Sequence, residues 1–191
     1  MMDQKRRFKP TREDVLLYLA FTCIANYLVA TAVSLLSQWF IVDLGAPVVY
    51  PFLCIGSFAG TLALFWWRFR ERIFAQYRPG MQTRDLIRGA LLTVLPGEAL
   101  RFLLSLVTLG SAGLTGGMSL AATVLFERTY LTWAGRYDAV RAEGAVALSD
   151  VFAYILCYLL YLSVYLLAVI GIYWLVWRAR KKERAQLGAE L

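Results

Sequence analysis

The chain has 191 residues, of which 60% are hydrophobic and 17% charged, and its net charge is +7. Soluble domains are about 45–50% apolar and about 25% charged, so this composition excludes an ordinary soluble domain. The basic residues flank long apolar runs, as in membrane proteins, and form no basic stripe with exposed aromatics, which excludes a nucleic-acid partner. We therefore predict an all-α, polytopic helical bundle of the cell membrane, with residues 1–191 forming one membrane domain.

The composition also limits which catalytic and metal sites the chain can form. The sequence contains no histidine, which removes Ser-His and Cys-His catalysis, His-ligated haem and most zinc sites. The cysteines, Cys23, Cys54 and Cys157, lie in separate apolar runs, and no CxxC pair occurs. We predict no metal site, no cofactor and no assignable catalytic residue, and an enzyme is the less favoured class.

The first apolar run covers residues 15–42. Thr11 and Asp14 have the spacing of a capping box and predict a helix start. The run continues past an A-x-A site at residues 30–32, so we interpret it as an uncleaved first transmembrane span. A stripe of small and polar residues repeats every four positions along it, with Asn26 as its hydrogen-bonding member: Thr22, Asn26, Ala30 and Ser34.

A short connection leads to the second span, residues 48–67. Gly56 and Gly60 form a GxxxG pair, which predicts a helix-packing contact. The span ends in Phe-Trp-Trp-Arg-Phe-Arg at residues 65–70, aromatic rings followed by arginines, typical of a membrane interface.

The segment after the second span allows two topologies. Pro96-Gly97 is expected to end a short interfacial helix over residues 84–95, so that residues 99–126 form the third of four spans. Gly113 and Gly117 then belong to a small helix-packing face. Alternatively, the glycine-rich residues 110–117 form a turn between two spans, which makes five, or an unwound segment that coordinates a substrate.

The last span is expected over residues 150–177, capped by Ser149 after a polar loop from Gly135. Four spans place seventeen of the twenty lysines and arginines on the inner side, whereas five spans place fourteen there. The count favours four spans, with both termini cytoplasmic.

Glu98 and Arg101 are spaced for an ion pair on one helix face. With four spans this pair lies at the membrane boundary, where Glu98 suits the positive end of the helix dipole. With five spans it lies inside the bilayer, where an ionisable pair indicates a functional site.

Four tyrosines form a stripe with spacings of four, three and four along the last span. Buried hydroxyls need partners. The stripe therefore predicts a wet cavity, a ladder of interhelical hydrogen bonds, or an aromatic surface for a lipid tail or sugar ring; its members are Tyr154, Tyr158, Tyr161 and Tyr165.

We interpret the chain as a transport-related protein or membrane-complex subunit, with Asn26 and the tyrosines forming a polar intramembrane seam. One alternative is an enzyme acting on a lipid-linked substrate at the inner face through Glu98 and Arg101. The other is a purely structural assembly partner. The expected partners are other membrane subunits, a second copy of the chain, and membrane lipid. We interpret the basic tail first as a topology signal and only secondarily as a binding site for anionic headgroups; its residues are Arg178, Arg180, Lys181, Lys182 and Arg184.

Overall fold

The computed structural model describes residues 11–37, 49–77, 81–107, 126, 130–141 and 143–189. Within these ranges the chain is all-helical and has no strand, which confirms the all-α class. The helices are α1 (Arg12–Ser37), α2 (Val49–Gln76), α3 (Thr83–Val107), α5 (Tyr137–Arg141) and α6 (Leu148–Ala189).

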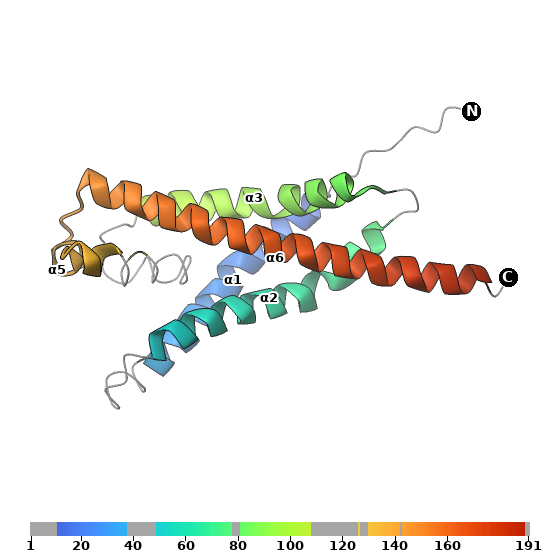
Figure 1. Cartoon of the computed structure of the whole chain (residues 1–191), viewed down its shortest axis with the longest axis horizontal. Helices are drawn as coiled ribbons and strands as arrows, with labels where there is room; N and C mark the ends of the chain where they lie inside the picture. The colour runs from blue at the N-terminus through green and yellow to red at the C-terminus, as the bar shows by residue number, and fades with distance from the viewer. Residues whose placement is uncertain are drawn as a thin grey trace.

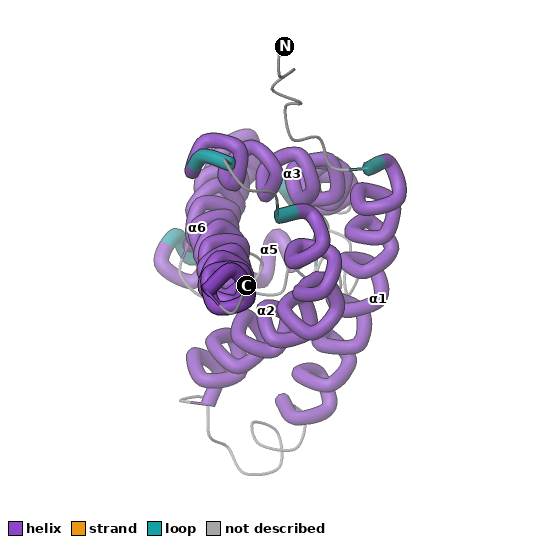
Figure 2. Tube along the Cα trace, turned by 90° about the vertical axis from the view of Figure 1, so that its right-hand side faces the viewer, coloured by secondary structure: helices purple, strands orange, loops and turns teal. Residues whose placement is uncertain are grey.

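The four long helices form a closed ring. Around the ring α1 packs against α2 and α3, and α6 packs against the same two helices, so that α1 and α6 lie diagonally opposite (Figure 2). Asp14 in the first turn of α1 bonds to Gln76, the last residue of α2. The start of α3 and the end of α6 lie toward this same end of the bundle (Figure 1). The helices therefore alternate in direction, which confirms a helical bundle.

The start of α1 follows the predicted capping box. The Thr11 amide donates to Asp14 Oδ2 at 3.1 Å, and the Asp14 amide donates to Thr11 Oγ1 at 3.2 Å. The amides of Thr11 and Asp14, which lack a carbonyl partner four residues earlier in the helix, thus receive side-chain acceptors.

The expected helix break at Pro96-Gly97 is wrong. α3 runs unbroken from Thr83 to Val107, so residues 84–95 are not a separate interfacial helix and the third long helix begins well before residue 99. Pro96 faces outward, whereas Gly97 and Glu98 lie on the buried face. Packing of that face against α1 and α6 outweighs the backbone hydrogen bond that proline removes. Beyond residue 107, only Phe126 of the expected third span is described.

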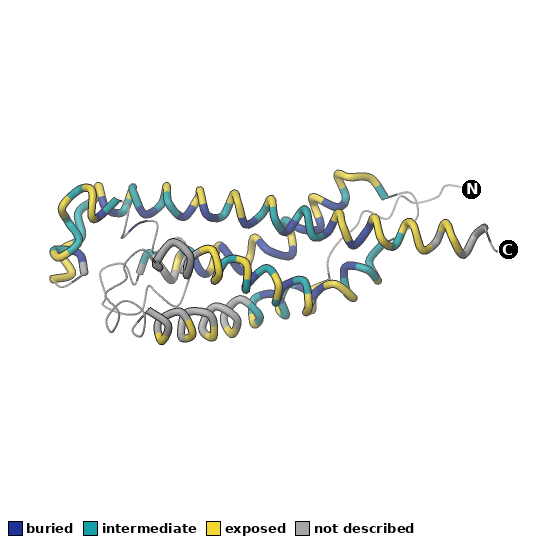
Figure 3. The backbone as a smooth tube through the Cα atoms, turned by 60° about the horizontal axis from the view of Figure 1, so that its bottom comes forward, coloured by how far each residue is buried: buried dark blue, intermediate teal, exposed yellow. Residues whose placement is uncertain are grey.

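Large apolar side chains lie on the outside of the bundle as well as in its core. Buried residues follow the inner faces of the helices and exposed residues their outer faces (Figure 3). The core consists mainly of aromatic and aliphatic side chains with a few charged groups, and further large apolar side chains point outward on all four long helices. Examples are Ile24, Ile55, Leu103 and Leu167.

Within the described residues, one helical segment, Leu148–Glu183 of α6, is long and apolar enough to cross a membrane. Only 17% of its apolar stretch is buried inside the bundle, whereas the core helix of a soluble protein would be mostly buried.

The loop expected between Gly135 and Ser149 contains a short helix, α5. Gly135 and Gly144 flank it with φ angles of 65° and 67°, a backbone conformation that suits glycine. α6 begins at Leu148, and its first turn is capped by Asp150, whose Oδ2 accepts the Ala147 amide at 2.8 Å. Ser149 therefore lies inside the helix and is not its cap.

Candidate functional site

A buried ion pair lies in the middle of α3. Arg101 Nη1 donates to Glu98 Oε1 at 2.8 Å, and the two side chains are 3% and 0% exposed. The spacing of three residues brings them together on one helix face, as the sequence predicted. Their expected place at the start of a helix is wrong, because no helix ends at Pro96 and Glu98 is instead the sixteenth residue of a 25-residue helix.

Two other helices supply hydroxyl donors to the Glu98 carboxylate. Tyr18 of α1 donates to Oε1 at 2.8 Å, and Tyr158 of α6 lies 3.0 Å from both Oε2 and the Glu98 carbonyl oxygen. Hydrogen bonds to a charged acceptor are shorter and stronger than neutral ones. The carboxylate therefore joins α1, α3 and α6 at a single point.

A further tyrosine extends this network across the ring. The hydroxyl oxygens of Tyr18 and Tyr165 lie 3.2 Å apart. A hydroxyl has one proton, so Tyr18 accepts from Tyr165 while it donates to Glu98. The contact links the diagonally opposite helices α1 and α6, so it must cross the centre of the bundle. We call Glu98, Arg101, Tyr18, Tyr158 and Tyr165 the central network.

The tyrosine stripe of α6 faces the interior. Tyr154, Tyr158, Tyr161 and Tyr165 are all buried, and neighbouring rings along the stripe lie 5.8–6.3 Å apart. The stripe also packs across the bundle, since the Phe58 ring of α2 contacts Tyr161 and Tyr165 edge-on. Aromatic burial of this kind fixes the Tyr158 hydroxyl beside Glu98 and the Tyr165 hydroxyl beside Tyr18.

The chemistry open to the central network follows from its donors. Glu98 receives a guanidinium proton and two hydroxyl protons, so its surroundings suit the ionised carboxylate paired with protonated Arg101. Removing two charges from water costs several kcal/mol per ion, roughly, and only good geometry with further hydrogen bonds repays it. The site can hold an ion pair, exchange a proton through the tyrosine hydroxyls, or release Arg101 to a competing anion.

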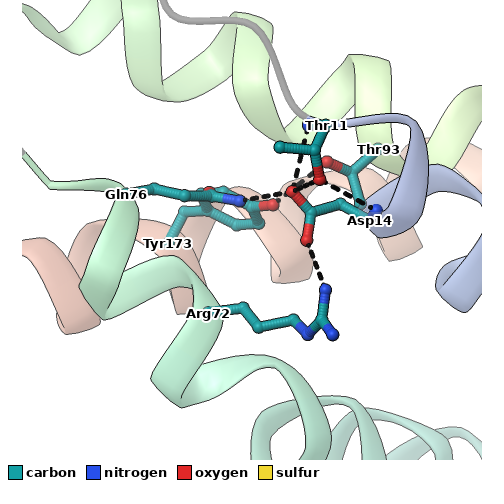
Figure 4. A network of polar contacts seen from close by, with 6 residues as sticks. All are labelled: Thr11, Asp14, Arg72, Gln76, Thr93 and Tyr173. Atoms are coloured by element: carbon teal, nitrogen blue, oxygen red, sulfur yellow. Dashed lines mark hydrogen bonds and ion pairs between the residues drawn. The ribbon is translucent and has the colours of Figure 1, made fainter.

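A second polar cluster joins α1 to the end of α2 (Figure 4). Asp14 accepts from Arg72 Nη1 and Gln76 Nε2, both at 3.0 Å, in addition to Thr11. Burial by itself would raise the pKa of Asp14, but the hydrogen bonds from Thr11 and Arg72 and the charge of Arg72 outweigh it, so this pKa is lowered. Asp14 thus fixes the α1–α2 contact as a carboxylate.

Next to this cluster, α3 and α6 share a neutral contact. The Tyr173 hydroxyl donates to Thr93 Oγ1 at 3.3 Å (Figure 4). Thr93 Oγ1 in turn donates to the Gly89 carbonyl at 2.9 Å. Both side chains are buried. The α3–α6 interface therefore has polar contacts at two levels, at Thr93 and at Glu98.

A third cluster lies at the opposite end of the bundle. Arg136 Nε lies 2.9 Å from both carboxylate oxygens of Asp150, and its Nη2 donates to Asp150 Oδ2 at 2.7 Å and to the Ala145 carbonyl at 2.8 Å. The hydrogen bonds to Asp150 raise the pKa of Arg136. This fork clamps the residues before α6 onto its first turn.

The structure places the other predicted site residues apart from the central network. The helix-packing role of Gly56 and Gly60 is not found in the described residues, because a Cβ added at either position would meet no atom within 4 Å. The buried side of α2 is instead formed by Thr61, Phe65, Phe69 and Ile73. Gly113, Gly117 and the side chain of Asn26 lie outside what the structure describes.

Tyr18 is the functional residue that the sequence analysis missed. It is fully buried and donates a hydrogen bond to Glu98, and its ring centroid lies 6.0 Å from those of Phe65 and Phe69 of α2. The sequence does contain a pattern that includes Tyr18. This residue lies four positions before Thr22 and thus extends the four-residue repeat that runs to Ser34. Asp14 extends the same repeat by one more step.

No group of three His, Cys, Asp or Glu side chains in the described ranges could hold a metal ion. Comparisons with protein-family models, with curated proteins and with solved structures found no match. Inference about function therefore depends on the residues of the chain itself.

Proposed function

We propose that the protein is a small polytopic membrane protein, either transport-related or a subunit of a membrane complex, whose working group is the Glu98 carboxylate. The observation that carries the proposal is the Glu98–Arg101 ion pair, buried where three helices meet. Ionisable pairs inside a membrane bundle are costly, and they mark ion pathways, proton relays and ligand sites.

Placement in a membrane is supported by the apolar side chains that face outward. Isolated apolar side chains are normal on soluble proteins, but large apolar side chains along the outer faces of four helices, around a core that holds a buried ion pair, are not. Every α-helix satisfies its own backbone hydrogen bonds, which is what lipid demands. We infer that α1, α2, α3 and α6 each contribute one transmembrane span, that of α1 beginning after Asp14, with α3 providing the third span in place of residues 99–126.

The orientation is supported by charge. By position in the sequence, sixteen of the twenty lysines and arginines belong to the N-terminal segment, the α2–α3 connection with its flanking turns, and the end of α6. Three, Arg128, Arg136 and Arg141, belong to the opposite end, and Arg101 lies within the bundle. The positive-inside rule then puts both termini in the cytoplasm.

In a transport role, a proton or a cation competes with Arg101 for Glu98. Protonation of Glu98 would break the ion pair and turn one carboxyl oxygen into a donor, so Tyr18 or Tyr158 would have to rotate its hydroxyl. Because those tyrosines belong to α1 and α6, the change would reach two helices that do not carry the carboxylate.

The structural alternative is supported by the saturation of the carboxylate. Each Glu98 oxygen already has a donor, so the network needs no ligand to be complete. In that role the network specifies which helices meet, as buried polar groups do in some bundles. The burial of Glu98 and Arg101 does not favour an enzyme acting on a lipid-linked substrate at the inner face.

Reconstitution of the full chain in liposomes tests the proposal. An imposed pH gradient should drive proton movement that a trapped pH-sensitive dye records, and Glu98→Gln should abolish it while the protein stays folded. Tyr173→Phe, a buried change outside the central network, should keep it. Absence of proton movement together with destabilisation by Glu98→Gln would support the structural subunit. Absence of both effects would overturn both roles of Glu98.

A further inference from the structure

A pocket opens between α2 and α6, near the end of the bundle where α6 leaves it. Its volume is about 360 Å³, within the range of small-ligand pockets. It is distinct from the central network, and four of its lining residues come from α2 and two from α6. The lining residues are Trp66, Arg70, Glu71, Phe74, Val176 and Ala179.

The walls of this pocket are mainly apolar, and the charged residues that line it are exposed. Trp66, Phe74 and Val176 offer rings and methyl groups, while Arg70 and Glu71 add one charge of each sign at exposed positions. The guanidinium of Arg180 lies 4.1 Å from the centre of the Phe74 ring. Its Nη1 pairs with Glu183 at 2.6 Å, but its buried Nε has no hydrogen-bond partner.

The surroundings of the pocket are basic and aromatic. Arg178 lies over the Trp174 ring at 5.1 Å, and Lys181 and Lys182 are exposed on the next turn of α6. On α2, Trp67 is 77% exposed next to Arg68. Tryptophans followed by basic residues mark the level of lipid headgroups.

We propose that this pocket binds one anionic phospholipid of the inner leaflet, with its phosphate on the guanidinium of Arg70 and the start of one acyl chain against Trp66, Phe74 and Val176. Arg180 supplies a second guanidinium for the phosphate. Glu71 accepts a hydrogen bond from a headgroup hydroxyl, as phosphatidylglycerol offers. The inference depends on the proposed membrane placement. It goes further than that proposal, because it assigns one specifically bound lipid to the pocket.

Charge and shape favour a lipid over other occupants. A guanidinium matches a phosphate oxygen pair in a planar fork, and cations near an anionic leaflet gain from its surface potential. The pocket volume suits a headgroup and the beginning of a chain rather than a whole lipid, so the rest of the chain must continue along the exposed apolar outer surface of α6.

Native mass spectrometry of the full chain in detergent tests the inference. Titration with phosphatidylglycerol should give a single tightly bound lipid, and phosphatidylcholine should bind more weakly. Arg70→Gln should weaken phosphatidylglycerol binding about fivefold, the effect of losing one basic residue near the surface. The matched control is Arg68→Gln, which removes the same charge two residues away on the exposed side of α2 and should change binding little.

A second variant blocks the space without removing charge. Ala179→Trp, at an exposed position on the pocket rim, should fill the pocket, leave folding intact and abolish the selective lipid. Equal effects of Arg70→Gln and Arg68→Gln, or no effect of Ala179→Trp, would reduce the pocket to diffuse surface charge and overturn the inference. Soluble glycerol phosphate that binds as tightly as the lipid would overturn it as well.

The two proposals can fail separately. If the wild-type protein leaves the membrane fraction without detergent, the membrane placement fails. If it stays there but binds phosphatidylglycerol and phosphatidylcholine equally, the lipid pocket fails alone.

Discussion

Tyr18 on α1 donates a 2.8 Å hydrogen bond to Glu98 on α3, and its hydroxyl also lies 3.2 Å from that of Tyr165 on α6. The Tyr18 hydroxyl thereby connects the Glu98 carboxylate to α6, the helix diagonally opposite α1. Its ring packs on Phe65 and Phe69 of α2, so a single side chain contacts all of the other long helices. A substitution at Tyr18 consequently tests the whole arrangement.

Tyr18→Phe should lower the free energy of unfolding by about 1–3 kcal/mol, because Glu98 stays buried with one donor fewer. Tyr173→Phe is the matched control, since it loses only a 3.3 Å bond to the neutral Thr93 hydroxyl and should cost about 0.6 kcal/mol. Thermal unfolding of the two variants in detergent measures the difference. Equal losses would mean that the carboxylate does not depend on Tyr18.

Glu98→Gln and Arg101→Gln should be strongly non-additive. Each single change leaves one buried charge without its partner and should cost about 3–5 kcal/mol, whereas the double variant removes both charges and should cost less than the sum. A double-mutant cycle of unfolding free energies measures the coupling. Additive losses would show that the two groups are held independently.

Stability should depend on the ionisation of Asp14. The pKa of Asp14 is lowered in the folded state, whereas it is about 3.9 in an unfolded chain. Its contribution is therefore complete above about pH 4 and is lost as the pH falls through the lowered folded pKa. Asp14→Asn should reduce the unfolding temperature at pH 7, and the gap to the wild type should narrow as the pH falls below about 4. Asp138→Asn, at an exposed position of α5, is the control and should produce no such gap.

Gly60→Ala should stabilise the protein. An added Cβ meets no atom within 4 Å, and alanine is a better helix former than glycine by about 0.5–1 kcal/mol. Gly56→Ala should act in the same direction. A lower unfolding temperature in either variant would indicate a close contact at that glycine.

A cysteine placed at the exposed Glu143, in a chain with Cys23, Cys54 and Cys157 replaced by alanine, should react with a membrane-impermeant maleimide in intact cells. The reason is the low positive charge of this end of the bundle. In a separate variant, a cysteine placed at the exposed Lys181 of α6 should react only after permeabilisation. The reverse pattern would mean that α6 crosses in the opposite direction, through either an inverted orientation or five spans. Labelling of both positions from outside would mean that α6 does not cross the membrane.

Local spacing predicted the two halves of the central network but not their meeting. Residues three or four apart share a helix face, which is why the Glu98–Arg101 pair and the tyrosine stripe could be read from the sequence. Which helices become neighbours depends on packing between distant segments, and Tyr18 is 80 residues from Glu98. The sequence therefore suggested two separate sites where the structure has one.

Pro96 shows why the third helix was misplaced. Proline inside a helix removes one hydrogen bond and favours a break, and this local cost can be read from the sequence. What offsets it is the contact of Ala90, Val94, Gly97 and Glu98 with other helices, which no local pattern reveals. Because α3 continues past Pro96, the Glu98–Arg101 pair lies in the middle of a helix and not, as expected, at a helix start.

α6 is 42 residues long, about 63 Å at 1.5 Å per residue, which is roughly twice the hydrocarbon thickness of a membrane. It runs unbroken from the tyrosines around Glu98 to Ala189, and its last turns extend beyond the other helices (Figure 1). From Tyr158 to Ala189 this rod measures about 46 Å, and Tyr173, Trp177 and Arg180 hold it against α3 and the end of α2 along the way. A tilt of α6 at the buried carboxylate therefore has to displace these contacts together with the charged tip, which couples the centre of the bundle to its end.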